Sequence, residues 1–344
     1  MPEIIDQLAE LTGLRDRDTL DVSLALALRD LLAPELVAVH RVVGEPGDER
    51  WQTRARLAPT DVTATADTTY FDNGSLPALA EHAEWQDCLS KHQTLCLAGT
   101  PNVTLFPMPA ESGTSGVVEV QTAQALSDDF IRLVNGVLRI YRNVHALLDY
   151  SERDTLTGLL NRKSFDETFY KMVALGMQAA QQAAAADPDR RALSPVRYWL
   201  GVIDIDHFKL VNDTFGHLIG DEVLLLLSRV MRGCFRHSDR LYRFGGEEFV
   251  VLLRCPTEKD AMTAMERFRV AVREYKFPQV NHVTISVGFT DLRAGDTPSS
   301  AVERADKAVY HAKHHGRDQV CSHSTLVSEG LVAQDNRDSD VEFF

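Results

Sequence analysis

Residues 240–253 read RLYRFGGEEFVVLL, in which two apolar-rich runs flank Gly245 and Gly246. Paired glycines supply the positive φ angles that a tight hairpin turn needs, so the stretch predicts an antiparallel β-hairpin. Two adjacent acids, Glu247 and Glu248, follow the glycines. Because successive side chains on a strand point to opposite faces, we expect only one of these acids to reach a given neighbouring site. Taken alone, acids on a hairpin are ordinarily solvated.

Earlier in the chain, a buried strand ends in acids. Residues 198–204 are mostly apolar, and they lead into Asp204, Ile205 and Asp206. Carboxylates at the end of a buried strand cost free energy unless something pairs with them, and hard oxygen ligands suit magnesium. A helix that we expect to begin near His207 would direct backbone N–H groups at a phosphate. The alternative is that an acid here only caps that helix, which is the commoner role of Asp after a strand.

Two further segments carry glycines or bases at informative spacings. Gly216 and Gly220 lie four apart ahead of an amphipathic helix, which predicts a tight turn where backbone or ligand comes close. Nearer the C-terminus, residues 305–317 predict a helix ended by a glycine. Lys313 and Arg317 would then share one helix face. They either bind a polyphosphate there or only interact favourably with the negative end of the helix dipole.

These segments together resemble the GGDEF family of diguanylate cyclases over residues 154–323. Each motif is weak alone, but all of them in this order are highly specific. The matching motifs are Asp154-Thr155-Leu156-Thr157-Gly158-Leu159-Leu160-Asn161-Arg162, Asp204-Ile205-Asp206-His207-Phe208-Lys209, Asn212, Gly216-His217-x-x-Gly220-Asp221, the signature loop Gly245-Gly246-Glu247-Glu248-Phe249, Ser286-Val287-Gly288 and Lys313-x-x-x-Arg317. The chain departs from the family's pattern in two places. Asp318 replaces the common Asn after Gly-Arg, and an insertion at 176–195, which we interpret as lying on the surface, is longer than in most members.

The resemblance implies an α+β, palm-like domain, with an antiparallel-rich sheet wrapped by helices. It implies that two GTP molecules are joined into cyclic di-GMP with release of two pyrophosphates. The cofactor would be magnesium, or manganese in its place. Asp204, the carbonyl of Ile205 and Glu247 would hold the metal. Glu247 would also deprotonate the attacking 3′-hydroxyl, with Lys209 as its catalytic partner at the phosphates.

The resemblance also assigns residues to the substrate and the product. Asn212 and Asp221 would read the guanine edge, with His217 beside the nucleoside, and a carboxylate facing guanine's N–H donors would reject adenine. The triphosphate would contact the Phe208 backbone, Lys209, Lys313 and Arg317. An RxxD motif ahead of the signature loop, Arg236 and Asp239, matches the family's site of inhibition by its product. The alternative for this motif is an Arg ending a helix and an Asp in a turn.

The N-terminal part, residues 1–126, predicts a small α+β sensor domain that resembles a GAF domain, with a PAS fold as its nearest competitor. We expect a helix at 19–32 and strands at 36–43, 94–97, 104–107 and 116–120. The sequence does not identify the ligand of this domain. It also leaves open whether the domain activates or inhibits.

A linker, residues 127–153, predicts a helix with an apolar repeat at spacings of four and three. Its members are Phe130, Val134, Val137, Tyr141, Val144 and Leu148. This seam predicts a homodimer through the linker helix, and through the GAF-like domain as well. The alternative is an amphipathic helix packed on its own domain, because other apolar residues widen the face. Residues 324–344 are acidic and patternless, which predicts disorder.

Bulk properties limit the partners. The formal net charge of −14 argues against a nucleic-acid partner, and no apolar run reaches the roughly 18 residues of a membrane span. The N-terminus lacks a signal peptide, and the five cysteines form no CxxC pair, so we expect a cytoplasmic protein with reduced thiols. Two other functions remain open. One is an inactive receptor that binds GTP or cyclic di-GMP and signals through partner proteins. The other is a different nucleotidyl transferase, against which Asn212 and Asp221 argue.

Overall fold

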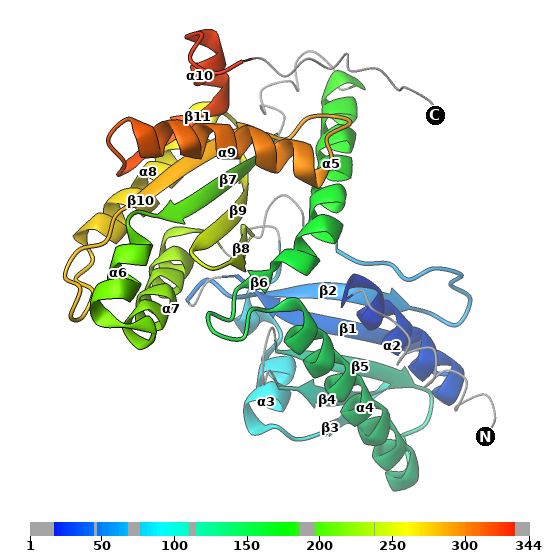
Figure 1. Ribbon diagram of the computed structural model, residues 1–344. Helices are drawn as coiled ribbons and strands as arrows, with labels where there is room; N and C mark the ends of the chain where they lie inside the picture. The colour runs from blue at the N-terminus through cyan, green and yellow to red at the C-terminus, as the bar shows by residue number, and fades with distance from the viewer. Residues whose placement is uncertain are drawn as a thin grey trace, which may run out of the picture. The chain divides into compact units, whose positions relative to one another are not determined.

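The chain folds into two compact units. The computed structural model describes residues 17–44, 47–67, 76–109, 115–185, 197–236 and 238–333. The first unit ends at Ser151 and the second begins at Glu152, two residues before the predicted start of the catalytic region (Figure 1). No helix among the described residues is long and apolar enough to cross a membrane.

The first unit is built on a five-stranded antiparallel sheet in the order β2-β1-β5-β4-β3. The strands are β1 (Leu36–Val43), β2 (Arg50–Leu57), β3 (Leu95–Leu97), β4 (Asn102–Met108) and β5 (Gly116–Thr122). These include all the strands predicted for this region. Strand β2 was not predicted, because its sequence RWQTRARL has no apolar run, although Trp51, Ala55 and Leu57 are buried.

Helices cover both faces of this sheet. Helices α2 (Arg17–Leu32) and α4 (Asp128–Glu152) share one hydrophobic cluster with one face. The short helix η2 (Leu79–Glu81) precedes α3 (Ala83–Lys91), whose Trp85 packs with Trp51 on the other face. The predicted helix at 19–32 is confirmed as α2. The first unit is therefore an α+β domain, as expected.

Helix α4 belongs to the core of the first unit and does not stand apart as a linker. Val134, Val137, Tyr141 and Val144, four members of the predicted seam, are at most 8% exposed and pack in the cluster with α2 and the sheet. A buried polar contact reinforces this packing: the Tyr141 hydroxyl donates to Asp21 of α2 at 2.8 Å. The amphipathic alternative is confirmed for this face, so these four residues are not available as a dimer seam.

The second unit is built on a six-stranded sheet in the order β11-β10-β7-β9-β8-β6. The central pairs β10–β7, β7–β9 and β8–β9 are antiparallel, and the two outer pairs are parallel. The strands are β6 (Leu160–Asn161), β7 (Arg197–Ile205), β8 (Arg240–Gly245), β9 (Glu248–Cys255), β10 (Ile285–Asp291) and β11 (Gln319–Ser322). This confirms the predicted hairpin and the antiparallel-rich sheet.

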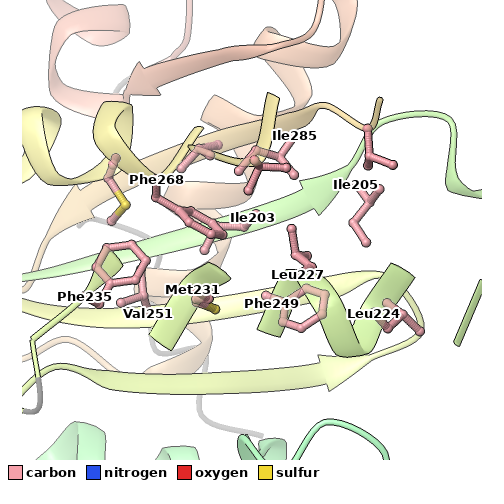
Figure 2. Packing of buried hydrophobic residues seen from close by; sticks show 14 of the residues in the cluster. Ile203, Ile205, Leu224, Leu227, Met231, Phe235, Phe249, Val251, Phe268 and Ile285 are labelled. Carbon is pink, nitrogen blue, oxygen red and sulfur yellow. The ribbon is translucent and has the colours of Figure 1, made fainter. Parts of the chain in front are cut away.

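Helices also wrap both faces of the second sheet. Helices α7 (His217–Cys234) and α8 (Glu258–Glu274) pack on one face, where Leu227, Met231 and Phe268 meet Ile203 and Phe249 (Figure 2). Helices α5 (Arg162–Ala185) and α9 (Pro298–His314) pack on the other face. The short helix α6 (Phe208–Phe215) connects β7 to α7. The predicted insertion begins within α5, and its residues 186–195 lie outside the described residues.

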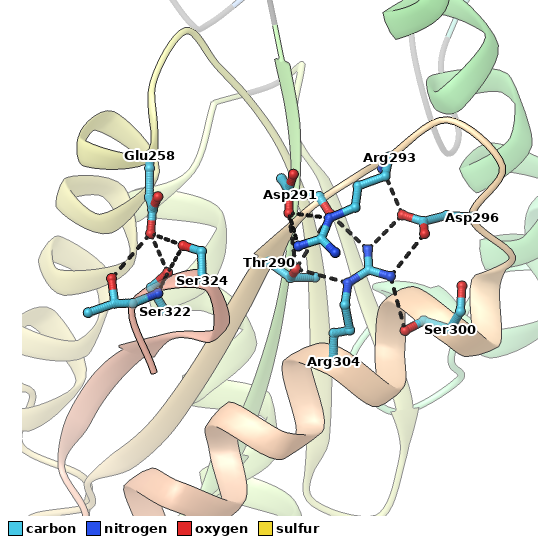
Figure 3. Close-up of polar contacts among 10 residues, drawn as sticks. Glu258, Thr290, Asp291, Arg293, Asp296, Ser300, Arg304, Ser322 and Ser324 are labelled. Carbon is cyan, nitrogen blue, oxygen red and sulfur yellow. Dashed lines mark hydrogen bonds and ion pairs between the residues drawn. The ribbon is translucent and has the colours of Figure 1, made fainter. Parts of the chain in front are cut away.

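Helix α9 is fixed tightly to the sheet at two points. A Cβ atom on Gly288 of β10 would lie 2.2 Å from the Ala305 carbonyl oxygen, so only glycine permits this close approach. Near the start of the helix, the buried Arg304 forms two hydrogen bonds to Asp296, at 2.9 and 2.6 Å, and one to Thr290 (Figure 3). Lys313 is near the end of α9. By fixing α9 on the sheet, the contacts of Gly288 and Arg304 also fix the position of the Lys313 backbone.

Three local predictions were wrong. Helix α7 begins at His217, so Gly220 lies within a helix and only Gly216, with φ of 84°, lies at a turn. Helix α9 ends at His314, so Arg317 is not on its face. Residues 323–328 form helix α10 (His323–Ser328), whose Leu326 packs against Ala312 of α9, so the disorder predicted from 324 does not begin there. Residues 334–344 lie outside the described residues.

Candidate active site

The acidic residues of the second unit meet at the ends of β7 and β9. Asp204, 6% exposed, is paired directly with Glu248 across the antiparallel ladder. Glu247 lies in the turn before β9, where Gly245 and Gly246 have φ of 145° and 51°. That only one of the two glutamates joins Asp204 at a single metal site stays a prediction. Strand alternation does not apply to a turn residue, and both Glu247 and Glu248 interact electrostatically with Asp204.

Lys313 supplies the positive charge of this cluster. Its Nζ lies 2.7 Å from Oδ2 of Asp204, while Oδ1 of Asp204 is buried without a hydrogen-bond partner. Burial raises the pKa of Asp204 although Lys313 opposes the shift, and Glu248 and Asp206 add to it. A buried carboxylate oxygen with no donor carries an unmet desolvation cost, which a cation would relieve.

Two further carboxyl groups are affected by the same charges. Burial and then the charge of Asp204 raise the pKa of Glu247, which Lys313 partly offsets. Burial, followed by Glu248 and Asp204, raises the pKa of Asp306 on α9 to about 6. Asp306 was not among the predicted site residues. Its position seven residues before Lys313, two helical turns away on the same face, was the signal that would have found it.

The turn at Gly245 and Gly246 is linked through Arg243 to Asp154, the first residue of the motif that opens the region. The Arg243 guanidinium donates to the Gly246 carbonyl from Nη2 at 2.9 Å and to the Asp154 carboxylate from Nη1 at 3.0 Å. Asp154 in turn accepts from the backbone N–H and the hydroxyl of Thr157. The backbone of the turn that presents Glu247 is therefore fixed, because Arg243 binds the Gly246 carbonyl while it forms an ion pair with Asp154.

The residues predicted to read guanine lie on α6 and at the start of α7. Asn212 of α6 lies over Gly220, since a Cβ on Gly220 would come within 2.0 Å of the Asn212 Oδ1. Asp221, the next residue, is exposed, as is His217 at the first position of α7. Phe208, the first residue of α6, is buried, and Lys209 is exposed. The structure thus brings Asn212 and the start of α7 together.

Replacing Gly220 with alanine should therefore displace the Asn212 amide. Alanine suits a helix interior, so we expect the thermal stability to change little. If Asn212 reads guanine, as the resemblance implies, the KM for GTP should rise about tenfold, because one hydrogen bond to the base is lost. Gly233→Ala is the matched control, since a Cβ there meets nothing within 4 Å. An unchanged KM in the Gly220 variant would show that Asn212 does not read the base.

Comparisons with known proteins identify the second unit. The family model "Diguanylate cyclase, GGDEF domain" matches residues 151–319. Those residues form a GGDEF domain. Over 170 residues, this chain is 38% identical to the diguanylate cyclase DgcP of Pseudomonas aeruginosa and 36% identical to DgcM of Escherichia coli K12. The matched segments make up 48% and 49% of this chain but only 23% and 38% of those relatives. This chain therefore spans well under two thirds of the relatives' lengths.

A solved structure gives a similar result. The crystal structure of the diguanylate cyclase SiaD in complex with its activator SiaC, from Pseudomonas aeruginosa, is 36% identical in sequence. The match covers 57% of this chain and 71% of that chain, with a TM-score of 0.46.

The RxxD motif of this GGDEF domain lies in the turn after α7. The Arg236 backbone N–H donates to Asp239 Oδ2 at 2.9 Å, so Asp239 stabilises the turn, as the alternative interpretation requires. Burial raises the pKa of Asp239, although the nearby Arg236 and Arg267 lower it. The Arg236 residue itself is exposed. A structural role for Asp239 and a binding role for Arg236 are thus compatible.

Proposed function

We propose that this protein is a diguanylate cyclase that condenses two GTP molecules into cyclic di-GMP and two pyrophosphates. The observation that carries the proposal is the buried, donor-less Oδ1 of Asp204 beside Glu247 and Lys313, within a GGDEF domain whose signature loop is intact. Relatives that match this domain are named diguanylate cyclases.

Magnesium, or manganese in its place, fits the ligands at the end of β7. Asp204, the Ile205 carbonyl and Glu247 would hold it, and these are hard oxygen donors of the type that magnesium prefers. Among the described residues, no three His, Cys, Asp or Glu side chains form a metal cluster. When bound, the metal would offset charge on the phosphates.

The remaining residues would bind GTP. Asn212 and Asp221 would accept guanine's N–H donors, with His217 beside the nucleoside. Adenine would leave these groups unpaired, which costs affinity. Lys209, Arg317 and the Phe208 backbone N–H at the start of α6 would contact the triphosphate. Lys313 would leave Asp204 to join them as the phosphates arrive.

The chemical step is an in-line displacement at the α-phosphate. The 3′-oxygen of one GTP forms a bond to the α-phosphorus of the other, and the bond from that phosphorus to the bridging oxygen breaks, releasing pyrophosphate. The hydroxyl proton passes to Glu247. A raised pKa brings this carboxylate closer to the basicity that a general base needs.

Two chains are needed, because each GGDEF domain would provide one guanine pocket and cyclic di-GMP contains two phosphodiester bonds related by two-fold symmetry. A second apolar stripe on α4, beside its buried face, is suited to hold the pair. It consists of Leu133, Ile140 and Leu147, which recur every seven residues. Leu147 is 69% exposed, and Tyr150, three residues further along the helix, is 75% exposed. We propose a parallel homodimer through this stripe, controlled by the GAF-like unit.

Incubation of the protein with GTP and magnesium, followed by product analysis, tests the function. Cyclic di-GMP and pyrophosphate should form in a ratio of one to two, and ATP should yield no cyclic product. Binding of GTP or cyclic di-GMP without turnover would instead establish the alternative, a nucleotide receptor.

Product feedback is a separate proposal. A guanidinium pairs well with phosphate and guanine acceptors, so Arg236 would bind cyclic di-GMP at the turn after α7. Arg236→Ala should raise the concentration of cyclic di-GMP that halves the rate by about tenfold or more, and leave the initial rate unchanged. Equal inhibition of both proteins would place the inhibitory site elsewhere.

A further inference from the structure

The loop after α9 has an unusual backbone. Three consecutive residues have positive φ: Gly316 at 110°, Arg317 at 60° and Asp318 at 42°. For residues other than glycine this region is sterically strained. The Arg317 backbone N–H closes the helix by donating to the Ala312 carbonyl at 3.0 Å. Such a conformation persists only when contacts from elsewhere in the fold enforce it.

The first of these contacts comes from Asp206, the second acid after β7. Its Oδ2 accepts the Asp318 backbone N–H at 3.0 Å and the Thr284 hydroxyl at 2.7 Å, and its Oδ1 accepts the Ser286 hydroxyl at 2.7 Å. With both oxygens engaged and only 6% of the residue exposed, Asp206 is tied to β10 and to the loop. It therefore differs from Asp204, whose Oδ1 has no donor.

The second contact comes from α8. The Asp318 carboxylate accepts from Arg269 Nη1 at 2.6 Å, and Arg273 Nη1 lies 3.7 Å away. Arg269 also donates to Glu266 at 2.8 Å, which fixes its guanidinium. Burial alone would lower the pKa of Arg269, but its hydrogen bonds to Asp318 and Glu266 raise it, so the guanidinium stays charged. Asparagine, the common residue here in the family, would make a neutral contact.

We propose that Asp206, Asp318 and Arg269 are positioning residues for Arg317. Asp206 and Arg269 hold Asp318, the residue after Arg317, and so fix the loop beyond the end of α9. The exposed Arg317 guanidinium would then face the triphosphate from a fixed backbone. Pre-ordering of this kind raises affinity because the loop loses less freedom on binding. The inference rests on the proposed function, in which Arg317 binds the phosphates of GTP.

The test uses Arg269→Met in the full-length protein. This residue lies on α8, where it contacts Asp318 and not the nucleotide. The KM and the dissociation constant for GTP should each rise about threefold to tenfold, with kcat nearly unchanged, because one charged contact that orders the loop is lost. The affinity for guanosine, which has no phosphates, should not change. Arg293→Met is the matched control, since Arg293 forms an ion pair of 3.0 Å with Asp291 before the other end of α9.

Two further variants separate positioning from general stability. Asp318→Asn should keep the KM near the wild-type value, because asparagine tolerates positive φ and still accepts from Arg269. In an Arg317→Ala background, Arg269→Met should add no further loss. If Arg317→Ala weakens GTP binding and Arg269→Met does not, the positioning role is overturned while the proposed function stands. If Arg317→Ala has no effect either, the phosphate role of Arg317 and the positioning role fail together. Cyclic di-GMP formation by the wild-type protein judges the proposed function independently.

Discussion

Replacing Glu247 with glutamine should lower the rate of cyclic di-GMP formation about a thousandfold, within the range for loss of a general base. The amide keeps the size of the side chain but cannot accept the 3′-hydroxyl proton, and it is a poorer magnesium ligand. The rate should be measured by product analysis at saturating GTP, where binding differences do not contribute.

The fold of this variant should be preserved, because Glu247 lies in a turn and carries an unfavourable charge beside Asp204. Its melting temperature should equal or slightly exceed that of the wild type. Glu274→Gln, at the end of α8, is the matched control and should retain full activity. A Glu247→Gln protein that forms product at the wild-type rate would remove Glu247 from both proposed roles.

Replacing Leu147 with glutamate should separate the proposed dimer and reduce specific activity by more than about tenfold at low protein concentration. Two copies would bring like charges together across the stripe on α4. Activity should recover partly as the protein concentration rises. Light scattering gives the oligomeric state, and product formation at matched concentrations gives the activity.

Ala146→Glu is the control for this experiment, because Ala146 is exposed on the same helix but lies away from the stripe. It should leave both mass and activity unchanged. A Leu147→Glu protein that is monomeric and yet fully active would contradict the dimer. Val137→Glu is a poor substitute, since Val137 is only 4% exposed and a charge there would unfold the first unit.

Sequence patterns predicted what depends on neighbouring residues. The hairpin around Gly245, the strand ending at Asp204 and the helix over 19–32 each arise from local periodicity or turn chemistry, and all three are present. Strand β2 escaped prediction because arginines and polar residues interrupt its buried apolar residues, which leaves no apolar run.

Features that depend on distant residues were misjudged. Lys313 and Arg317 were predicted to share one face of α9, but the helix ends at His314. The loop beyond it is held by Asp206, 112 residues before Asp318, and no local pattern predicts that contact. The seam on α4 was misassigned because the helix has two apolar stripes, and only the tertiary contacts tell which one meets α2. Asp206 looked like a cap or a ligand, since its partners Thr284 and Ser286 are equally remote in sequence.

The buried hydrogen bond from Tyr141 of α4 to Asp21 of α2 makes α4 part of the first unit's core. It therefore limits where fragments and chimaeras of this protein can begin and end. A fragment that ends at residue 126 would lose α4, which packs in the core of the first unit, and it should aggregate. A fragment that extends to Ser151 keeps its own core. Chimaeras that exchange the first unit between GGDEF domains should therefore join after α4, so that the donor unit brings its own helix. A graft made before α4 would force one protein's helix to fit another protein's interior.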